Sequence, residues 1–270
     1  MTIPAANPVA VEVTRGQSLE TAFVESRHRA SCAVVAADGT IVHGWGDIEQ
    51  QVFPRSAIKP IQALPLIETG AADAFGYSAA EISLACASHH AEDRHINTVT
   101  DILGRIGLTP DALECGPKIS IDEAVKIERL KKGVEARRLG SDCSGKHTGF
   151  LATAVHMGED PAGYIGRSHP VQQRIFQTIS EMCDVDVSTL PEGIDGRSIP
   201  ALAIPLSALA LGMAKLANPT GLGAVREAAA DRVVQSIAAE PFMIAGTGSF
   251  CTDINAVLKG KVIVKTGAEG

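Results

Sequence analysis

The chain has 270 residues, of which 45% are hydrophobic, 20% are charged and only 4% are aromatic. Its formal net charge of −7 argues against a nucleic-acid partner or an anionic membrane surface, and the scarcity of aromatic residues argues against a base-stacking surface. The N-terminal segment has no basic stretch followed by a long apolar run, and six widely spaced cysteines form no C-x-x-C pair. We therefore expect a cytoplasmic protein with reduced thiols and no membrane span.

The N-terminal part of the chain predicts strands. Residues 9–14 alternate apolar and polar side chains, as in a half-buried strand. Residues 31–37 and 40–46 are two further apolar segments, separated by Asp38-Gly39. This dipeptide suits a two-residue turn, so the two segments predict a β-hairpin.

The middle of the chain predicts helices. One covers residues 56–68, is kinked by Pro65 and ends at Gly70. Ser78 and Glu81 have the spacing of a capping box at the start of the next helix. Further helices are expected over residues 93–106, 122–132, 145–156, 170–183 and 225–240. The uncharged run 198–214 predicts a buried helix or a strand–helix junction.

Two strands are expected near the C-terminus, over residues 242–245 and 254–264, the second broken by Lys259-Gly260. Strands at both ends and helices between them predict an α/β protein. In this fold the N- and C-terminal strands form one antiparallel sheet flanked by helices. We expect one domain over residues 1–270 that lacks a C-terminal segment, because the chain stops on a glycine-rich loop after an apolar strand.

The sequence R-S-A-I-K-P, residues 55–60, places Ser56 and Lys59 three residues apart. On a helix this spacing puts both side chains on one face. A buried lysine that gives up its proton can take the proton of a serine hydroxyl, which makes a Ser-Lys nucleophile without histidine. The alternative is a helix N-cap serine beside a solvated lysine, because S-x-x-K is common by chance.

Three more polar segments lie in apolar surroundings: C-A-S-H-H-A-E (86–92), S-D-C-S-G-K-H (141–147) and K-T-G (265–267). S-x-x-K, S-D-x and K-T-G in this order are typical of penicillin-recognising serine enzymes, although Cys143 replaces the usual asparagine. Of the adjacent His89 and His90, we expect at most one to face a pocket.

Together with G-I-D-G (193–196) and K-T-G-A-E-G (265–270), these motifs resemble the bacterial L-asparaginase II family. The resemblance runs from V-T-R-G (13–16) to the end of the chain. It implies a fold similar to that of serine β-lactamases and glutaminases, hydrolysis of L-asparagine to aspartate and ammonia, a homodimer, two Ser-Lys pairs and a zinc site.

The matching motifs imply a role for individual residues. The two pairs are Ser56 with Lys59 and Ser88 with Lys265, the zinc ligands are Cys143 and Lys146, and the substrate-binding residues are Arg55, His147 and Asp195. Either Ser56 or Ser88 can form the acyl-enzyme ester, and the sequence does not separate the two.

The chain departs from the family at Arg197, which follows G-I-D-G where the family has a cysteine as its third zinc ligand. Arginine stays protonated and cannot bind a metal. A guanidinium about 4 Å from a zinc ion would oppose binding by about 8 kcal/mol at an effective dielectric constant of about 20. This is a large share of the ~10–16 kcal/mol of a structural zinc site, so we expect zinc to bind weakly or not at all.

Three functions compete. The first is an L-asparaginase, the second a penicillin-recognising serine hydrolase or peptidase, and the third a non-catalytic relative that binds an amino acid. The absence of an export signal argues against the second function, because its substrates lie outside the cytoplasm. Arg197 and the missing C-terminal segment motivate the third.

Overall fold

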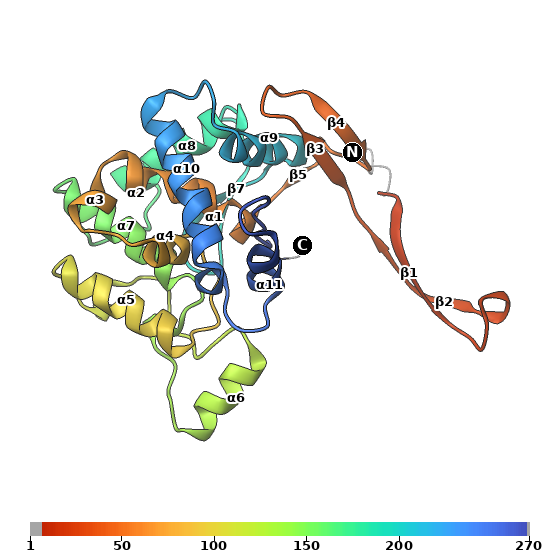
Figure 1. Cartoon of the computed structure of the whole chain (residues 1–270), viewed down its shortest axis with the longest axis horizontal. Helices are drawn as coiled ribbons and strands as arrows, with labels where there is room; N and C mark the ends of the chain where they lie inside the picture. The colour runs from red at the N-terminus through yellow and green to blue at the C-terminus, as the bar shows by residue number, and fades with distance from the viewer. Residues whose placement is uncertain (1–6, 269–270) are drawn as a thin grey trace.

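A body of packed helices surrounds helix α7 (Ser144–His156), and two β-hairpins extend from one side of this body (Figure 1). The computed structural model describes residues 7–268. Helix α7 is buried along most of its length. Around it pack α2 (Leu64–Glu68), α4 (Ala79–Ala85), α5 (Asp93–Arg105) and α8 (Pro170–Cys183). The residues of the central motif S-D-C-S-G-K-H thus enter or precede the most buried helix.

The remaining elements cover this core or connect it. The other α-helices are α1 (Lys59–Gln62), α3 (Ala71–Ala74), α6 (Glu123–Lys131), α9 (Leu206–Ala217), α10 (Ala224–Ala239) and α11 (Phe250–Leu258). Short 3-10 helices are η1 (Leu19–Thr21), η2 (Arg55–Ile58), η3 (Pro110–Ala112), η4 (Arg138–Gly140) and η5 (Pro241–Ile244).

The strands form separate two-stranded antiparallel sheets. The pairs are β1 (Val9–Arg15) with β2 (Phe23–Arg29), β3 (Cys32–Val35) with β4 (Ile41–Trp45), β5 (Gln51–Val52) with β8 (Ile204–Pro205), and β6 (Glu192–Ile194) with β7 (Pro200–Leu202). The β1–β2 hairpin projects far from the helices (Figure 1).

Local sequence signals explain how α4 meets α7. The Glu81 carboxylate accepts the backbone N–H of Ser78 at 2.7 Å, and the Ser78 hydroxyl accepts the N–H of Glu81, which completes the expected capping box. Gly145 allows a close approach of the two helices, because a Cβ atom there would lie 2.3 Å from the carbonyl oxygen of Leu84. Only glycine fits this contact without a shift of the backbone.

Most of the predicted elements are confirmed. The helices expected over residues 93–106, 122–132, 145–156, 170–183 and 225–240 are α5, α6, α7, α8 and α10. The helix expected over 56–68 is present as η2, α1 and α2, and it is interrupted at Ala63, just before Pro65. The first strand and the hairpin around Asp38-Gly39 are also confirmed, and residues 200–217 form a strand–helix junction.

The prediction of two strands near the C-terminus is wrong. Residues 241–244 form the 3-10 helix η5, and residues 250–258 form α11. The α/β character is confirmed, but β8 is the last strand within residues 7–268, so the N-terminal strands pair with no C-terminal strand there. The likeness to the serine β-lactamase fold and the single domain stay predictions.

Candidate active site

Loop segments from distant parts of the chain converge on a pocket of about 560 Å³. All four polar segments of the sequence contribute to its wall. Lining residues from the motifs are Arg55, Ser56, Lys59, Ser88, His90, Asp142, Cys143, Asp195, Gly196, Arg197, Lys265, Thr266 and Gly267. The rest of the wall comes from Lys118, Ile121, Ala245, Ser249, Cys251 and Ala268.

Ser88 lies between two lysine amines at the centre of this group. Lys59 Nζ and Lys265 Nζ each donate to Ser88 Oγ at 2.9 Å. Lys59 is almost fully buried, with 1% of its surface exposed, and its amine also donates to the carbonyl of Ala87 at 2.5 Å. Burial, followed by the positive charge of Lys59, lowers the pKa of Lys265 to about 7. At neutral pH a large fraction of Lys265 is therefore an uncharged amine that can accept a proton.

The backbone around Ser88 is fixed by hydrogen bonds to the last residue of η5 and to the residue after it. The N–H groups of Ser88 and His90 donate to the carbonyls of Ile244 and Ala245, at 3.0 and 2.7 Å. Lys265 lies in an irregular segment after α11, and its amine also donates to the carbonyl of Thr266. The hydroxyl and its two lysines are thus placed by three separate parts of the chain.

Ser56 and Arg55 line the same pocket beside Lys59. The sequence suggested a Ser56–Lys59 pair, but the Lys59 amine donates to Ser88 and Ala87 instead. Among residues 7–268, no hydrogen bond or ion pair involves the side chain of Ser56 or Arg55. Arg55 has φ of 51°, a left-handed conformation that is uncommon for a residue with a Cβ atom. Strain of this kind concentrates at functional sites.

Two carboxylates, Asp142 and Asp195, also line the pocket, and each is paired with a cation; of these cations Arg197 lines the pocket, whereas Lys146 does not. Asp142 Oδ1 accepts from Arg197 Nε at 3.1 Å and from Arg197 Nη2 at 2.5 Å. Asp195 pairs with the amine of Lys146 at 3.2 Å. Burial would raise the pKa of each carboxyl, but nearby positive charges outweigh it and hold both pKa values below the usual range. Both groups are therefore carboxylates at neutral pH.

The histidines of the motifs divide between the pocket and the core. His90 lines the pocket. His89 is fully buried, and its Nε2 bonds to Ser144 Oγ at 2.9 Å. Only one of the two adjacent histidines therefore faces the pocket, as expected. His147 is also fully buried, and its Nδ1 bonds to the hydroxyl of Tyr164 at 2.6 Å. It is not among the residues that line the pocket, so direct contact with substrate does not fit its position.

The residues implied as zinc ligands do not fit a metal site. Cys143 Sγ donates to Asp142 at 3.4 Å and the Lys146 amine donates to Asp195, so both groups are used as proton donors to carboxylates. Metal binding requires a thiolate and a neutral amine. Arg197 supplies a guanidinium in place of a ligand. Within residues 7–268, no group of three or more His, Cys, Asp or Glu side chains is arranged to hold a metal ion.

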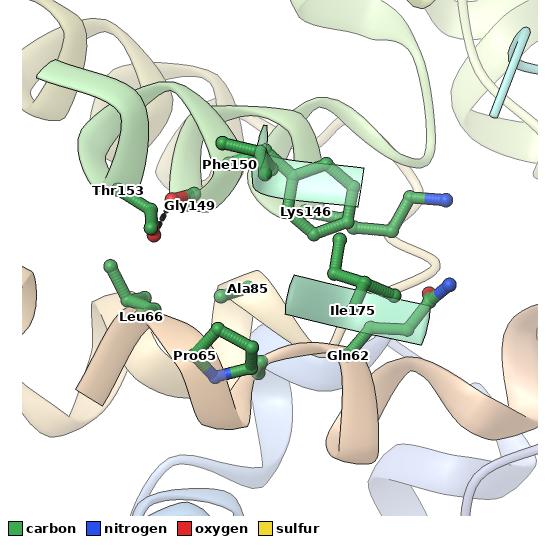
Figure 2. Close-up of a pocket in the computed structure, with 11 residues that line it drawn as sticks. Gln62, Pro65, Leu66, Ala85, Lys146, Gly149, Phe150, Thr153 and Ile175 are labelled. Atoms are coloured by element: carbon green, nitrogen blue, oxygen red, sulfur yellow. Dashed lines mark hydrogen bonds between the residues drawn. The ribbon is translucent and has the colours of Figure 1, made fainter. Parts of the chain in front are cut away.

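A second, very small void lies between α1, α2, α4, α7 and α8 (Figure 2). It holds about 10 Å³, roughly the room of one water molecule, and is lined mainly by apolar atoms. The stem of Lys146 passes Phe150 here, and in Figure 2 its amine points away from Leu66 and Thr153. The void is too small for a substrate, but it shows how an apolar wall surrounds the lysine stem.

Sequence reasoning missed several residues of the pocket. Asp142 had a signal, because it lies inside the motif S-D-C-S-G-K-H, but no role was assigned to it. Lys118 and Ile121 precede a charged helix and carry no motif, so nothing in the sequence indicated their position.

The described part of the chain contains no helix long and apolar enough to cross a membrane.

Comparison with known families agrees with this geometry. The model of the L-asparaginase II family matches residues 11–270. The chain therefore belongs to this family, which makes it an amidohydrolase of the asparaginase type that acts on a small molecule. No curated protein matches the chain significantly.

Proposed function

We propose that the protein hydrolyses L-asparagine to aspartate and ammonia, and that Ser88 is the hydroxyl that attacks the side-chain amide. The observation that carries this proposal is the placement of Ser88 Oγ, 2.9 Å from both Lys59 Nζ and Lys265 Nζ. Lys265, with a pKa of about 7, is the general base, because a base works best when its pKa lies near the operating pH. Ser56 has no amine within hydrogen-bonding distance among the described residues.

The proposed reaction has two stages. Neutral Lys265 takes the proton of Ser88 as Oγ attacks the amide carbon, and the positive charge of Lys59 stabilises the developing negative charge on Oγ. The carbon–nitrogen bond then breaks, and Lys265 returns the proton to the leaving nitrogen as ammonia forms. In the second stage Lys265 takes a proton from a water molecule as this water attacks the aspartyl ester. Aspartate is released, and Lys265 gives the proton to Ser88 Oγ.

Charge on the pocket wall supports a substrate that carries a carboxylate. With Lys265 neutral as the general base, the lining cations are Arg55, Lys59, Lys118 and Arg197, against the carboxylates Asp142 and Asp195. Arg55 has no side-chain partner among residues 7–268, so its guanidinium is available to bind the α-carboxylate. Asp195 retains acceptor capacity beyond its present donors and would bind the α-ammonium group.

The location and assembly of the protein belong to the same proposal. We expect a cytoplasmic homodimer. The β1–β2 hairpin supports an assembly, because Val11, Phe23 and Val24 are exposed on a two-stranded ribbon that projects from the body. Isolated two-stranded ribbons are marginally stable, and their unpaired edges are usually covered. Light scattering of the purified chain measures the assembly directly.

Ammonia release from L-asparagine tests the function. Ser88→Ala should lower kcat by several orders of magnitude, as expected for loss of a nucleophile, and Ser56→Ala should lower it much less. Acid quenching during turnover, followed by peptide mass spectrometry, should find the aspartyl ester on the peptide that contains Ser88. An ester on Ser56 would make Ser56 the nucleophile and Ser88 a proton relay.

Two further results would replace the proposed function with one of its competitors. Binding of asparagine by calorimetry without ammonia release would indicate the non-catalytic relative. Rapid hydrolysis of nitrocefin, a chromogenic β-lactam, would indicate the penicillin-recognising hydrolase.

A further inference from the structure

Arg197 occupies a fixed position on the pocket wall. The turn that carries it is held by Asp195, whose Oδ1 accepts the N–H groups of Arg197 and Ile199 at 2.7 and 3.0 Å. From this turn the Arg197 side chain reaches Asp142, which lies just before α7. Two of its nitrogens donate to the same carboxylate oxygen. The side chain thereby joins the turn at 195–199 to the loop that leads into α7.

The groups around this contact are balanced by charge. Asp142 Oδ1 also lies 3.6 Å from Lys118 Nζ, and Asp142 Oδ2 accepts from the thiol of Cys143. Lys146 Nζ lies 3.2 Å from Asp195. Every carboxylate in the corner therefore has a cationic partner, and the thiol and the amine both act as donors to these carboxylates.

We propose that Arg197 is a built-in cation that takes the place of a metal ion in this corner of the pocket. It neutralises Asp142 and links the 195–199 turn to the start of α7. A metal ion bound by Cys143, Lys146 and residue 197 would supply the same positive charge and the same link. Arg197 is a positioning residue in this scheme, and the pocket keeps its shape without metal. The inference does not depend on the proposed reaction.

The metal content of the purified 270-residue chain tests the proposal without reference to activity. The wild-type protein is incubated with excess zinc, desalted and analysed by plasma mass spectrometry, and its Tm is measured with and without EDTA. We expect zinc far below one ion per chain and a Tm that EDTA does not change. One zinc ion retained per chain, or a Tm lowered by EDTA, would overturn the proposal.

A gain of function provides the second measurement. Arg197→Cys removes the guanidinium, adds a thiolate beside Cys143 and Lys146, and frees the Asp142 carboxylate. This variant should retain close to one zinc per chain, and zinc should raise its Tm. The matched control Arg197→Ala removes the guanidinium but supplies no ligand, so it should retain far less zinc than Arg197→Cys.

Each variant outcome decides the question. A folded Arg197→Cys protein, verified by circular dichroism, that binds no zinc would show that this corner is not one in which a metal can replace the guanidinium. Equal zinc retained by Arg197→Ala and Arg197→Cys would show that residue 197 makes no connection to the metal. Either result rejects the proposal, and the wild-type measurements decide it alone if Arg197→Cys does not fold.

Discussion

The charge of Lys59 should help to keep Lys265 neutral, and removing it should raise the pKa of Lys265. Both amines lie 2.9 Å from Ser88 Oγ, so the two nitrogens are no more than about 5.8 Å apart. At about 6 Å and an effective dielectric constant of about 20, two unit charges repel by about 3 kcal/mol, equivalent to about two pH units. Stronger screening by water halves this figure, so Lys59→Met should move the titration of Lys265 upward by about one to two pH units.

Chemical labelling measures this titration without the need for turnover. Only the neutral amine reacts with a small acylating reagent such as acetic anhydride, and peptide mass spectrometry reports the rate at Lys265 as a function of pH. The midpoint of this rate–pH curve should lie near pH 7 in the wild-type protein and about one to two pH units higher in Lys59→Met. Lys132→Met, which removes an exposed lysine of an ion pair on α6, is the matched control and should leave the midpoint unchanged.

Two results would refute the reasoning. An unchanged midpoint in Lys59→Met would show that burial alone lowers the pKa of Lys265. A wild-type midpoint near that of a lysine in water would remove Lys265 as the general base. Because burial is the larger cause, the midpoint in Lys59→Met should still lie below the ordinary lysine value of 10.5.

Three further predictions concern stability and substrate binding. The pKa of Lys265 is about 7 in the folded protein and 10.5 in the unfolded chain, so between these pH values the unfolded state binds more protons and the free energy of unfolding should rise with pH. Lys265→Met should abolish this rise, and urea unfolding at pH 7 should show the variant to be more stable by up to about 4–5 kcal/mol. Gly145→Ala should destabilise the protein by about 1–3 kcal/mol or more, because the added methyl group clashes with Leu84. The control Gly104→Ala, at an open helical position, should stabilise the protein by about 0.5–1 kcal/mol. Equal shifts in Tm would show that α4 and α7 are not closely packed at Gly145. Arg55→Ala should raise KM for asparagine about 10- to 100-fold with a smaller change in kcat, and an unchanged KM would exclude Arg55 as the carboxylate anchor.

Periodicity and capping predicted the helical body well, because those signals are local. Helix α5 has apolar residues at helical spacing, and α4 begins at a capping box whose two hydrogen bonds involve residues three apart. The polar motifs also identified the segments that meet at the pocket. Motif order in the sequence carries this information only through likeness to a family, since no local rule brings residues 59, 88 and 265 together.

The errors near the C-terminus have two causes, a helical spacing and a side-chain interaction, and both lie within the predicted strand 254–264. Ile254, Val257 and Leu258 have the i, i+3, i+4 spacing of a helix, but their apolar character was interpreted as a strand. The segment after α11 is irregular and bonds to a side chain instead of a strand. The side-chain amide of Asn255 accepts the N–H of Val264 at 2.8 Å and donates to its carbonyl at 2.9 Å. Apolar residues such as V-I-V (262–264) cannot distinguish this arrangement from a β-ladder.

The same limit applies to the partner of Lys59. A spacing of three residues indicates that Ser56 and Lys59 can share a helix face, but it does not say which acceptor the amine will reach. Residues 55–58 form a 3-10 helix and Lys59 begins α1 with its stem buried, so the amine reaches Ser88, 29 positions further along the chain. The nucleophile therefore had to be argued from three-dimensional distances.

Family membership predicts the lysine–serine cluster of this pocket, but it does not predict how the rest of the wall is held. The part of the wall that carries Asp142 and Asp195 needs positive charge, because both side chains are carboxylates there. A metal ion and a guanidinium both supply such charge, but a metal also needs deprotonated ligands, whereas a guanidinium leaves the Cys143 thiol and the Lys146 amine as donors. The single residue after G-I-D-G thus decides between the two solutions, and a chain with arginine there should depend on its own ion pairs for the shape of the site.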